Sequence, residues 1–221
     1  PAVLHDAARV LAAAGFAVDI PAHRLCCGRP LYEYGWLDHA RRLWHRTLDA
    51  LADDIDAGVP VVGLEPSCVS AFRDELPALF PEHPRAVRLA RQTRSLAELL
   101  ADVGYRPPPV APRRVLMHRH CHAAAVLSPE REEALLRSAG HDVDVLDSGC
   151  CGMAGAFGFQ RAKYDLSVAL AERALLPALR REPDATVIAD GFSCREQLRQ
   201  LAGVRACHLA ELLVDRSDPQ A

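Results

Sequence analysis

Apolar and polar segments alternate along the chain in an order that predicts strands separated by helices. Short apolar runs with the length of strands lie at residues 16–20, 59–64, 115–118, 142–146 and 186–190. Helical patterning marks residues 7–14, 36–55, 85–101, 129–139 and 159–180, and further helices are expected to begin at Cys68 and after Ser193. Ser67, Ser128 and Ser193 are expected to cap helices, the last in a capping box with Glu196. This order predicts βαβ units, parallel sheets and an α/β fold.

Matching segments in the two halves indicate an internal duplication. A Cys-Cys-Gly triplet at residues 26–28 is followed by Cys68, and a second triplet at 150–152 is followed by Cys194. The gaps from the first cysteine are similar, 68−26 = 42 and 194−150 = 44 residues. We therefore expect two βα-type halves related by a pseudo-two-fold axis. Their predicted bounds are 1–104 for the first repeat, truncated at its N-terminus, 105–112 for a proline-rich linker and 113–221 for the second repeat.

The spacing of the cysteines favours a metal centre over disulfides. Neighbouring cysteines make a strained disulfide, but two thiolates on one turn can reach the same metal, and a glycine beside them lets the backbone approach it. In the second half, Cys121, the pair at 150–151 and Cys194 each follow a different predicted strand, so their side chains are expected at one edge of the sheet. Cys68 and Cys194 are also expected in first helical turns, where a thiolate is favoured.

Several chemistries remain open for this sulfur set. Four thiolates bind iron–sulfur clusters or zinc, and a vicinal pair can also act in thiol–disulfide exchange. Ligands spread over three loops differ from a zinc ribbon and favour the bulkier iron–sulfur cluster. The histidines that flank Cys121, at positions 118, 120 and 122, are expected to ligate a metal, donate to its ligands or cap the next helix. Cys207 has no counterpart in the first half and is expected to be a small core residue.

The composition excludes some partners. A net charge of −3 and an aromatic content of 5% do not suggest a nucleic-acid surface. No apolar run approaches the roughly 20 residues of a membrane span. Eight cysteines that include adjacent pairs suggest a reducing, cytoplasmic setting, in solution or peripheral at the inner face of the membrane. The chain begins at Pro1 inside a helical pattern, so we expect it to be part of a longer polypeptide.

The two triplets and the motif around Cys194 resemble the cysteine-rich CCG domain. That domain is found in the B subunit of heterodisulfide reductase, in the iron–sulfur subunit of glycolate oxidase and in FAD-linked D-2-hydroxyacid dehydrogenases of the D-lactate and D-2-hydroxyglutarate type. The resemblance implies a [4Fe–4S] cluster, cubane or non-cubane, held on the turn of Gly152 by the ligands Cys121, Cys150, Cys151 and Cys194. It also implies a second, partial site at Cys26, Cys27 and Cys68.

The same resemblance implies an electron-transfer module that is not a complete enzyme. A 2-hydroxy acid would be oxidised at FAD on a partner domain or subunit, and the electrons would pass through this chain to a quinone or protein acceptor. No glycine-rich dinucleotide turn follows a predicted strand, so the flavin is expected elsewhere. The alternatives are a zinc-binding structural or interaction module and a thiol–disulfide redox protein.

Overall fold

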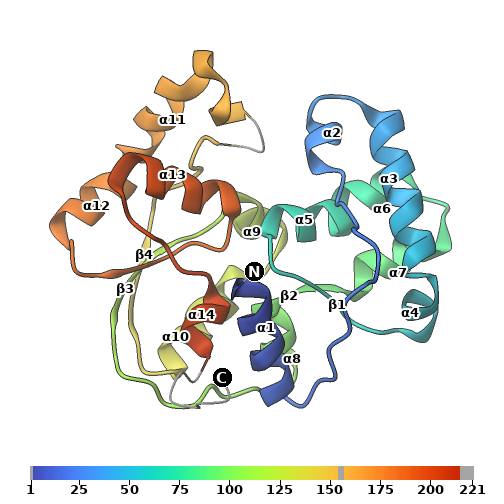
Figure 1. Cartoon of the computed structure of the whole chain (residues 1–221), viewed down its shortest axis with the longest axis horizontal. Coiled ribbons are helices and arrows are strands. Elements are labelled where there is room, and N and C mark those ends of the chain that lie inside the picture. Colours follow the sequence, from blue (N-terminus) through green and yellow to red (C-terminus); the bar gives the residue numbers. More distant parts are fainter. Residues whose placement is uncertain (1, 154–156, 215–221) are drawn as a thin grey trace.

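Parallel strands covered by helices form both halves of the molecule in the computed structural model, which describes residues 2–153 and 157–214 (Figure 1). The predicted α/β class is therefore confirmed. Residues 154–156, which follow the second triplet closely, lie outside the described part. Within that part, no helix combines the length and the apolar character that crossing a bilayer requires.

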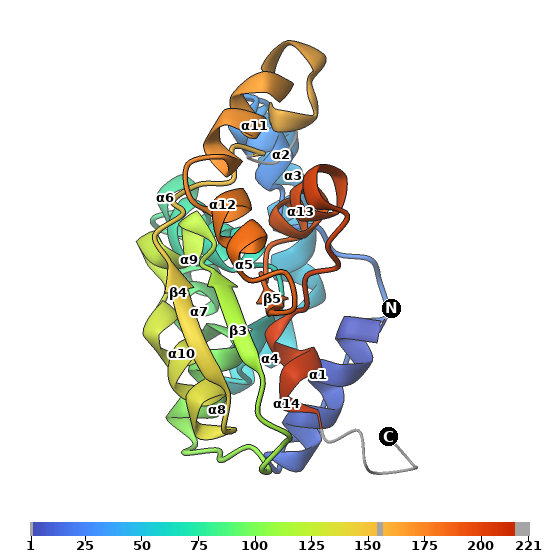
Figure 2. The same ribbon diagram turned by 90° about the vertical axis from the view of Figure 1, so that its left-hand side faces the viewer.

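The second half is built on a parallel sheet in which β3 (Arg114–His118) lies between β4 (Asp142–Leu146) and β5 (Thr186–Ile188). β3 and β4 run side by side in Figure 2. The strands are flanked by helices α9 (Cys121–Val126), α10 (Pro129–Ser138), α11 (Tyr164–Ala171), α12 (Leu175–Arg181), α13 (Phe192–Ala202) and α14 (Leu209–Leu213). Successive residues of β3 face opposite sides, so Val115 and Met117 enter one apolar cluster and Leu116 another. Both faces of the central strand are thereby buried, as parallel sheets require.

The first half has a smaller sheet, in which β1 (Val61–Gly63) pairs in parallel with β2 (Thr93–Ser95). Its helices are α1 (Ala2–Ala13), α2 (Arg29–Glu33), α3 (Leu37–Ala50), α4 (Ala52–Ala57), α5 (Pro66–Ser70), α6 (Leu76–Leu79), α7 (Pro84–Gln92) and α8 (Leu96–Asp102). A π-helical turn, Ala71–Glu75, joins α5 to α6. The helix expected over 85–101 is thus divided by β2, whose short polar sequence carries no strand signal.

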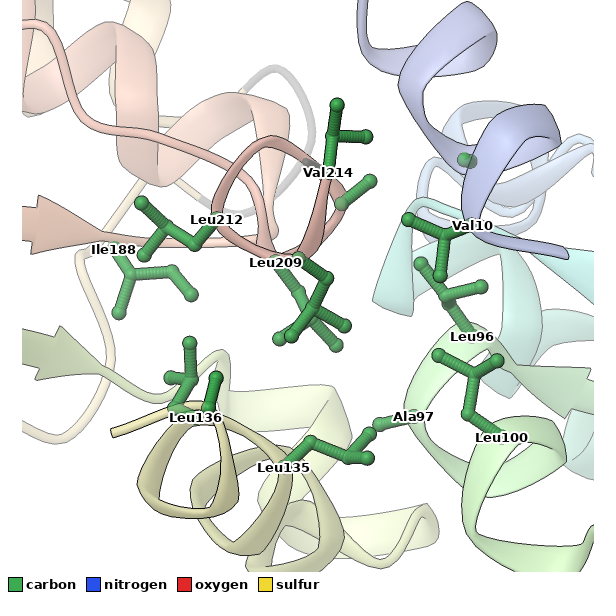
Figure 3. Packing of buried hydrophobic residues seen from close by; sticks show 14 of the residues in the cluster. Val10, Leu96, Ala97, Leu100, Leu135, Leu136, Ile188, Leu209, Leu212 and Val214 are labelled. Atoms are coloured by element: carbon green, nitrogen blue, oxygen red, sulfur yellow. The ribbon is translucent and has the colours of Figure 1, made fainter. Parts of the chain in front are cut away.

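One apolar core is shared by both halves (Figure 3). Val10 of α1 and Leu100 of α8 contribute from the first half, and Leu136 of α10 and Leu212 of α14 contribute from the second. Two smaller clusters lie apart, one under α12 and α13 and the other among α3, α4 and α7. The predicted linker at 105–112 contains neither helix nor strand. The principal core contains residues from both sides of this linker. The division into two domains stays a prediction.

The strand expected at residues 16–20 is wrong. This segment is irregular, and the side chains of Val18 and Ile20 are 42% and 55% exposed. It lines an apolar groove of about 500 Å³ whose other wall includes Val61 and Val62 of β1. Among the described residues no strand pairs with the backbone of this segment, since β1 lies across the groove and pairs with β2, and an apolar run without such a pairing does not become a strand.

Two of the three expected serine caps are also wrong. The N-cap of α5 is Glu65, whose carboxylate accepts from the amide of Ser67 at 3.4 Å. α13 begins at Phe192 after Gly191, so Ser193 lies inside the helix and forms no capping box. Ser128 does stand at the N-cap of α10, although its side chain makes no capping hydrogen bond within the described chain. The helix expected over 159–180 is instead divided into the two helices α11 and α12, preceded by 3-10 turns at Phe157–Phe159 and Arg161–Lys163.

Several local features nevertheless match between the halves. Cys68 and Cys194 are both the third residue of their helices. Val62 pairs with Arg94 in the first sheet, and an isolated parallel bridge joins Ile188 to Cys207 in the second. Cys207 is half-buried and packs against the shared core. These matches support the duplication, whose pseudo-two-fold axis stays a prediction.

Candidate metal centre

The second half brings four cysteines together at the carboxyl edge of its sheet. Cys121 opens α9 just after β3, the pair at 150–151 follows β4, and Cys194 lies in the first turn of α13 after β5. Because the three strands are parallel, their following loops emerge at the same edge. The sequence order therefore dictates the meeting point, although the three loops are distant in the chain.

The four side chains form a continuous series of sulfur contacts. Cys150 lies close enough to Cys121 and Cys151 for both to shift its pKa. Cys151 in turn lies close enough to Cys194 for each to shift the pKa of the other. Cys151 and Cys194 are only 5% and 1% exposed, whereas the other two are half-buried. A buried set of four adjoining sulfurs is a donor set suited to a soft metal or an iron–sulfur cluster.

The contacts shift the pKa values of the four groups in opposite directions. Hydrogen bonds from Cys121 and Cys151 lower the pKa of Cys150 to about 2. A hydrogen bond from Cys151, assisted by His118, also lowers the pKa of Cys194. Acting as the donors raises the pKa of Cys121 and Cys151, and burial raises them further. A metal that binds all four sulfurs must displace the protons that the thiols still hold.

Gly152 is required by the turn that carries the cysteine pair. Its φ is +75°, and its amide donates to the sulfur of Cys150 at 3.3 Å. A Cβ at this position would lie 2.5 Å from Cδ1 of Leu170 and 3.1 Å from Cα of Ser167. The glycine thus supplies both the left-handed backbone and the close approach to α11.

A buried polar network holds the carbonyl group of Cys151. The amide nitrogen of Gln197 donates to this carbonyl and to the hydroxyl oxygen of Ser167, the latter at 2.7 Å. The hydroxyl of Ser167 donates to the same carbonyl at 3.1 Å. Sequence reasoning missed both residues. Gln197 lies three residues after Cys194, almost one helical turn further along α13. This spacing was the available signal, because two side chains so placed share a helix face and can reach the same loop, here the one that carries Cys151.

The three histidines around Cys121 have different surroundings. Nδ1 of His118 lies 2.6 Å from the hydroxyl of Ser148, and a ring nitrogen of His118 lies within 4.8 Å of the sulfurs of Cys151 and Cys194. His120 caps α9 by accepting from the amide of His122 at 3.1 Å, so the capping alternative is confirmed for this residue. Of the three, only His118 belongs to the group of described residues that could hold a metal together with cysteines.

The first half brings together fewer sulfurs. The sulfurs of Cys27 and Cys68 lie 2.9 Å apart, and Cys26 is exposed. A hydrogen bond from Cys68 lowers the pKa of Cys27 to about 7 and raises that of Cys68. Gly28, with φ of +69°, places the turn against Trp44, whose indole donates to the carbonyl of Cys27 at 2.6 Å. The arrangement resembles the second turn but has a smaller donor set.

Glu65 connects the two cysteine groups, and sequence reasoning missed it. Its carboxylate caps α5, which carries Cys68, and accepts from the amide of Phe192 in α13 at 2.7 Å. It also lies 3.8 Å from Nε2 of His120. α5 and α9 lie side by side at this junction, where Ser70 contacts His122 at 3.0 Å (Figure 1). An acidic residue before Pro66 was the available signal for a cap.

The chain is similar to several known proteins. The chain is 29% identical over 217 residues to the C subunit of anaerobic glycerol-3-phosphate dehydrogenase of Escherichia coli (strain K12), covering 96% of this chain and 54% of the relative. It is 26% identical over 193 residues to "D-2-hydroxyglutarate dehydrogenase" of the same organism, covering 85% of this chain and 18% of the relative. With "Lactate utilization protein A" of Bacillus velezensis the identity is 28% over 226 residues, covering 94% of this chain and 90% of the relative.

The chain thus spans about half the length of the first of these relatives and less than a fifth of the second. A family model described as a cysteine-rich domain matches residues 1–73 and 115–199, which contain all the cysteines of both groups. These two ranges make up more than half of the chain. The resemblance expected from the triplets is confirmed, and the protein belongs to the cysteine-rich CCG domain family.

Proposed function

We propose that the chain is an iron–sulfur electron-transfer module of an FAD-linked 2-hydroxyacid dehydrogenase or oxidase. The observation that carries this proposal is the series of three contacts among four sulfurs that begins at Cys121 and ends at Cys194. These four cysteines would hold a [4Fe–4S] cluster of cubane or non-cubane type. Such a cluster supplies one-electron transfer when it is bound. The turn at Gly152 and the carbonyl held by Gln197 keep the sulfurs oriented toward one another.

The names of the relatives support the reaction class. One is a subunit of a dehydrogenase, one is a 2-hydroxyacid dehydrogenase and one is a lactate utilization protein. Because the matched region is a part of the first two, we propose that the flavin lies on a partner domain or subunit. Electrons would pass from it to a quinone or protein acceptor. The cysteine thiols fit a reducing compartment, so we place the module in the cytoplasm or at the inner face of the membrane.

A partner is proposed to dock near the second triplet. The side chain of Phe192 is 60% exposed although it lies only two residues from the buried Cys194. Cys150 is half-buried at the same edge. An electron donor that covers this edge would therefore come close to the sulfurs, whereas one face of the sheet is covered by the shared core. The partial group at Cys26, Cys27 and Cys68 is a proposed second site.

A zinc site is the second candidate, and one observation favours it. A ring nitrogen of His118 and the sulfurs of Cys151 and Cys194 all lie within 4.8 Å of one another. This mixed donor set suits tetrahedral zinc. It would use only two of the four adjoining cysteines, which is why the iron–sulfur proposal accounts for more of the site.

Metal and sulfide analysis separates the candidates. The chain is produced and reconstituted without oxygen, and iron, acid-labile sulfide and zinc are measured. The proposed function predicts about four iron and four sulfide per chain, with a brown colour. Stoichiometric zinc without sulfide would establish the zinc module instead. Thiols that bind neither and cycle between reduced and disulfide forms would indicate a thiol–disulfide protein.

A further inference from the structure

His118 is a buried polar group that the four-cysteine centre leaves unexplained. It ends β3 and is 2% exposed. Its Nδ1 contacts the hydroxyl of Ser148 at 2.6 Å, whereas its buried Nε2 has no hydrogen-bond partner among the described residues. The sulfurs of Cys151 and Cys194 lie close to the ring. A buried ring nitrogen without a partner is costly, so these sulfurs are its natural partners.

The proton on the ring follows from the two neighbours. A cysteine ligates a metal as its thiolate, so Cys194 is a thiolate in the loaded protein. A thiolate accepts hydrogen bonds, and it therefore selects the tautomer with the proton on Nε2. Nδ1 is then an acceptor, and the hydroxyl of Ser148 donates to it at 2.6 Å in preference to its longer contact, 3.5 Å, with the carbonyl of Leu146. Each group in the series from Ser148 through His118 to Cys194 is satisfied in this arrangement.

We propose that His118 is a positioning residue that donates a hydrogen bond from Nε2 to the sulfur of Cys194 and thereby raises the reduction potential of the bound cluster. The inference rests on the proposed iron–sulfur function. Reduction adds negative charge to the sulfur ligands, and an N–H donor stabilises the reduced state more than the oxidised one. Ser148 keeps the ring in the required tautomer, so its hydroxyl acts on the potential through His118.

The test compares reconstituted variants by iron content, midpoint potential and Fe–S stretching frequencies in resonance Raman spectra. His118→Leu removes the donor, His118→Gln retains an N–H donor, and Ser148→Ala removes the group that fixes the tautomer. His141→Leu is the matched control, because His141 is a buried histidine at the opposite end of β4. We expect unchanged iron in all four variants. The potential should fall most in His118→Leu, less in Ser148→Ala and least in His118→Gln, and should stay unchanged in the control.

Three results would overturn the proposal. A potential and Raman spectrum of His118→Leu equal to those of the unmodified chain would show that no hydrogen bond of consequence is made. Loss of iron in His118→Leu, with native circular dichroism, would make the histidine a ligand instead of a donor. Absence of iron and sulfide from the unmodified chain would contradict the proposed function itself. A cluster that is present but insensitive to His118→Leu would contradict only the role given to His118.

Discussion

The carboxylate of Glu65 accepts a hydrogen bond from the amide of Phe192 at 2.7 Å, although the two residues are 127 positions apart. The same side chain caps α5 by accepting from Ser67. One carboxylate thus orients the helix of Cys68 and the helix of Cys194. The two halves are joined by this bond at the edge where their cysteines lie, in addition to the shared core at the opposite end.

Replacement of Glu65 should therefore weaken the fold more than an ordinary surface change. Glu65→Ala removes a helix cap and the bond to Phe192, and we expect the free energy of unfolding to fall by about 2 kcal/mol. Urea denaturation of the metal-free chain measures it. Glu82→Ala, at an exposed position, is the control and should be nearly neutral. Equal unfolding free energies for the two variants would contradict the role given to Glu65.

Cys194 and Cys207 should differ sharply in their effect on bound iron. Cys194→Ser changes a sulfur in the contact series, whereas Cys207→Ser changes a residue that bridges to β5 and packs on the shared core. We expect a large loss of iron and sulfide in the first variant and unchanged content in the second, measured after identical anaerobic reconstitution. The ligand assignment fails if both variants retain the same amount of iron.

Gly152 offers a test of the turn against a control from the same loop. Gly152→Ala introduces a Cβ that collides with α11, and we expect a destabilisation of about 3 kcal/mol with loss of cluster binding. Gly149 also has a positive φ, of +60°, but the space around its Cα is open. Gly149→Ala should therefore cost only about 1 kcal/mol from backbone strain. Thermal denaturation and iron content of the two variants measure the difference.

The stability of the metal-free chain should depend on pH through His141. Burial lowers the pKa of this histidine, and the charge of Arg113 lowers it further, so the ring is neutral in the folded state. Its contribution is present above the unfolded-state pKa of about 6.5 and is lost as pH falls through the lower folded-state pKa. Between pH 7.5 and 5, His141→Leu should lose less stability than the unmodified chain in denaturant titrations. His39→Leu changes an exposed position and should keep the pH dependence of the unmodified chain. An equally large pH dependence of the unfolding free energy in His141→Leu would refute the role given to His141.

The reconstituted chain should not oxidise a 2-hydroxy acid on its own. Without a flavin-bearing partner, D-lactate or D-2-hydroxyglutarate should give no steady reduction of an artificial dye. The positive control is the same chain reduced first with dithionite, which should transfer its electrons to the dye once. Continuous turnover with either acid and no added flavoprotein would mean that the chain is an enzyme in its own right.

The strands of the second half could be predicted from the sequence because each is a short apolar run. Each forms in the structure because another strand lies beside it to pair with its backbone. It also placed Cys68 and Cys194 correctly in first helical turns. Residues 16–20 have the same apolar character but find no paired strand among the described residues, while the polar residues of β2 form one because β1 lies beside them. Sequence patterns record side-chain preference, whereas strand pairing depends on which backbone is adjacent.

The parts of the site that escaped prediction are those that join distant segments. Glu65 meets Phe192 across the junction of the halves, and Ser148 meets His118 between β3 and β4. Neither contact leaves a periodic or local mark in the chain. The cysteines could be assigned because adjacent thiols are uncommon and their spacing recurs, but the polar groups that orient them become visible only when the loops are placed together.

The shared core gives the molecule an order of assembly. α1, near the beginning of the chain, packs against α14, near the end of the described residues, and Val10 lies in the same cluster as Leu212 (Figure 3). During synthesis this core stays open until α14 has left the ribosome, which happens after Cys194 has been made. Closing contacts between such distant residues is slow. We therefore expect a cluster at the proposed site to be inserted only after α14 has been synthesised, and the thiols to need a reducing environment until then.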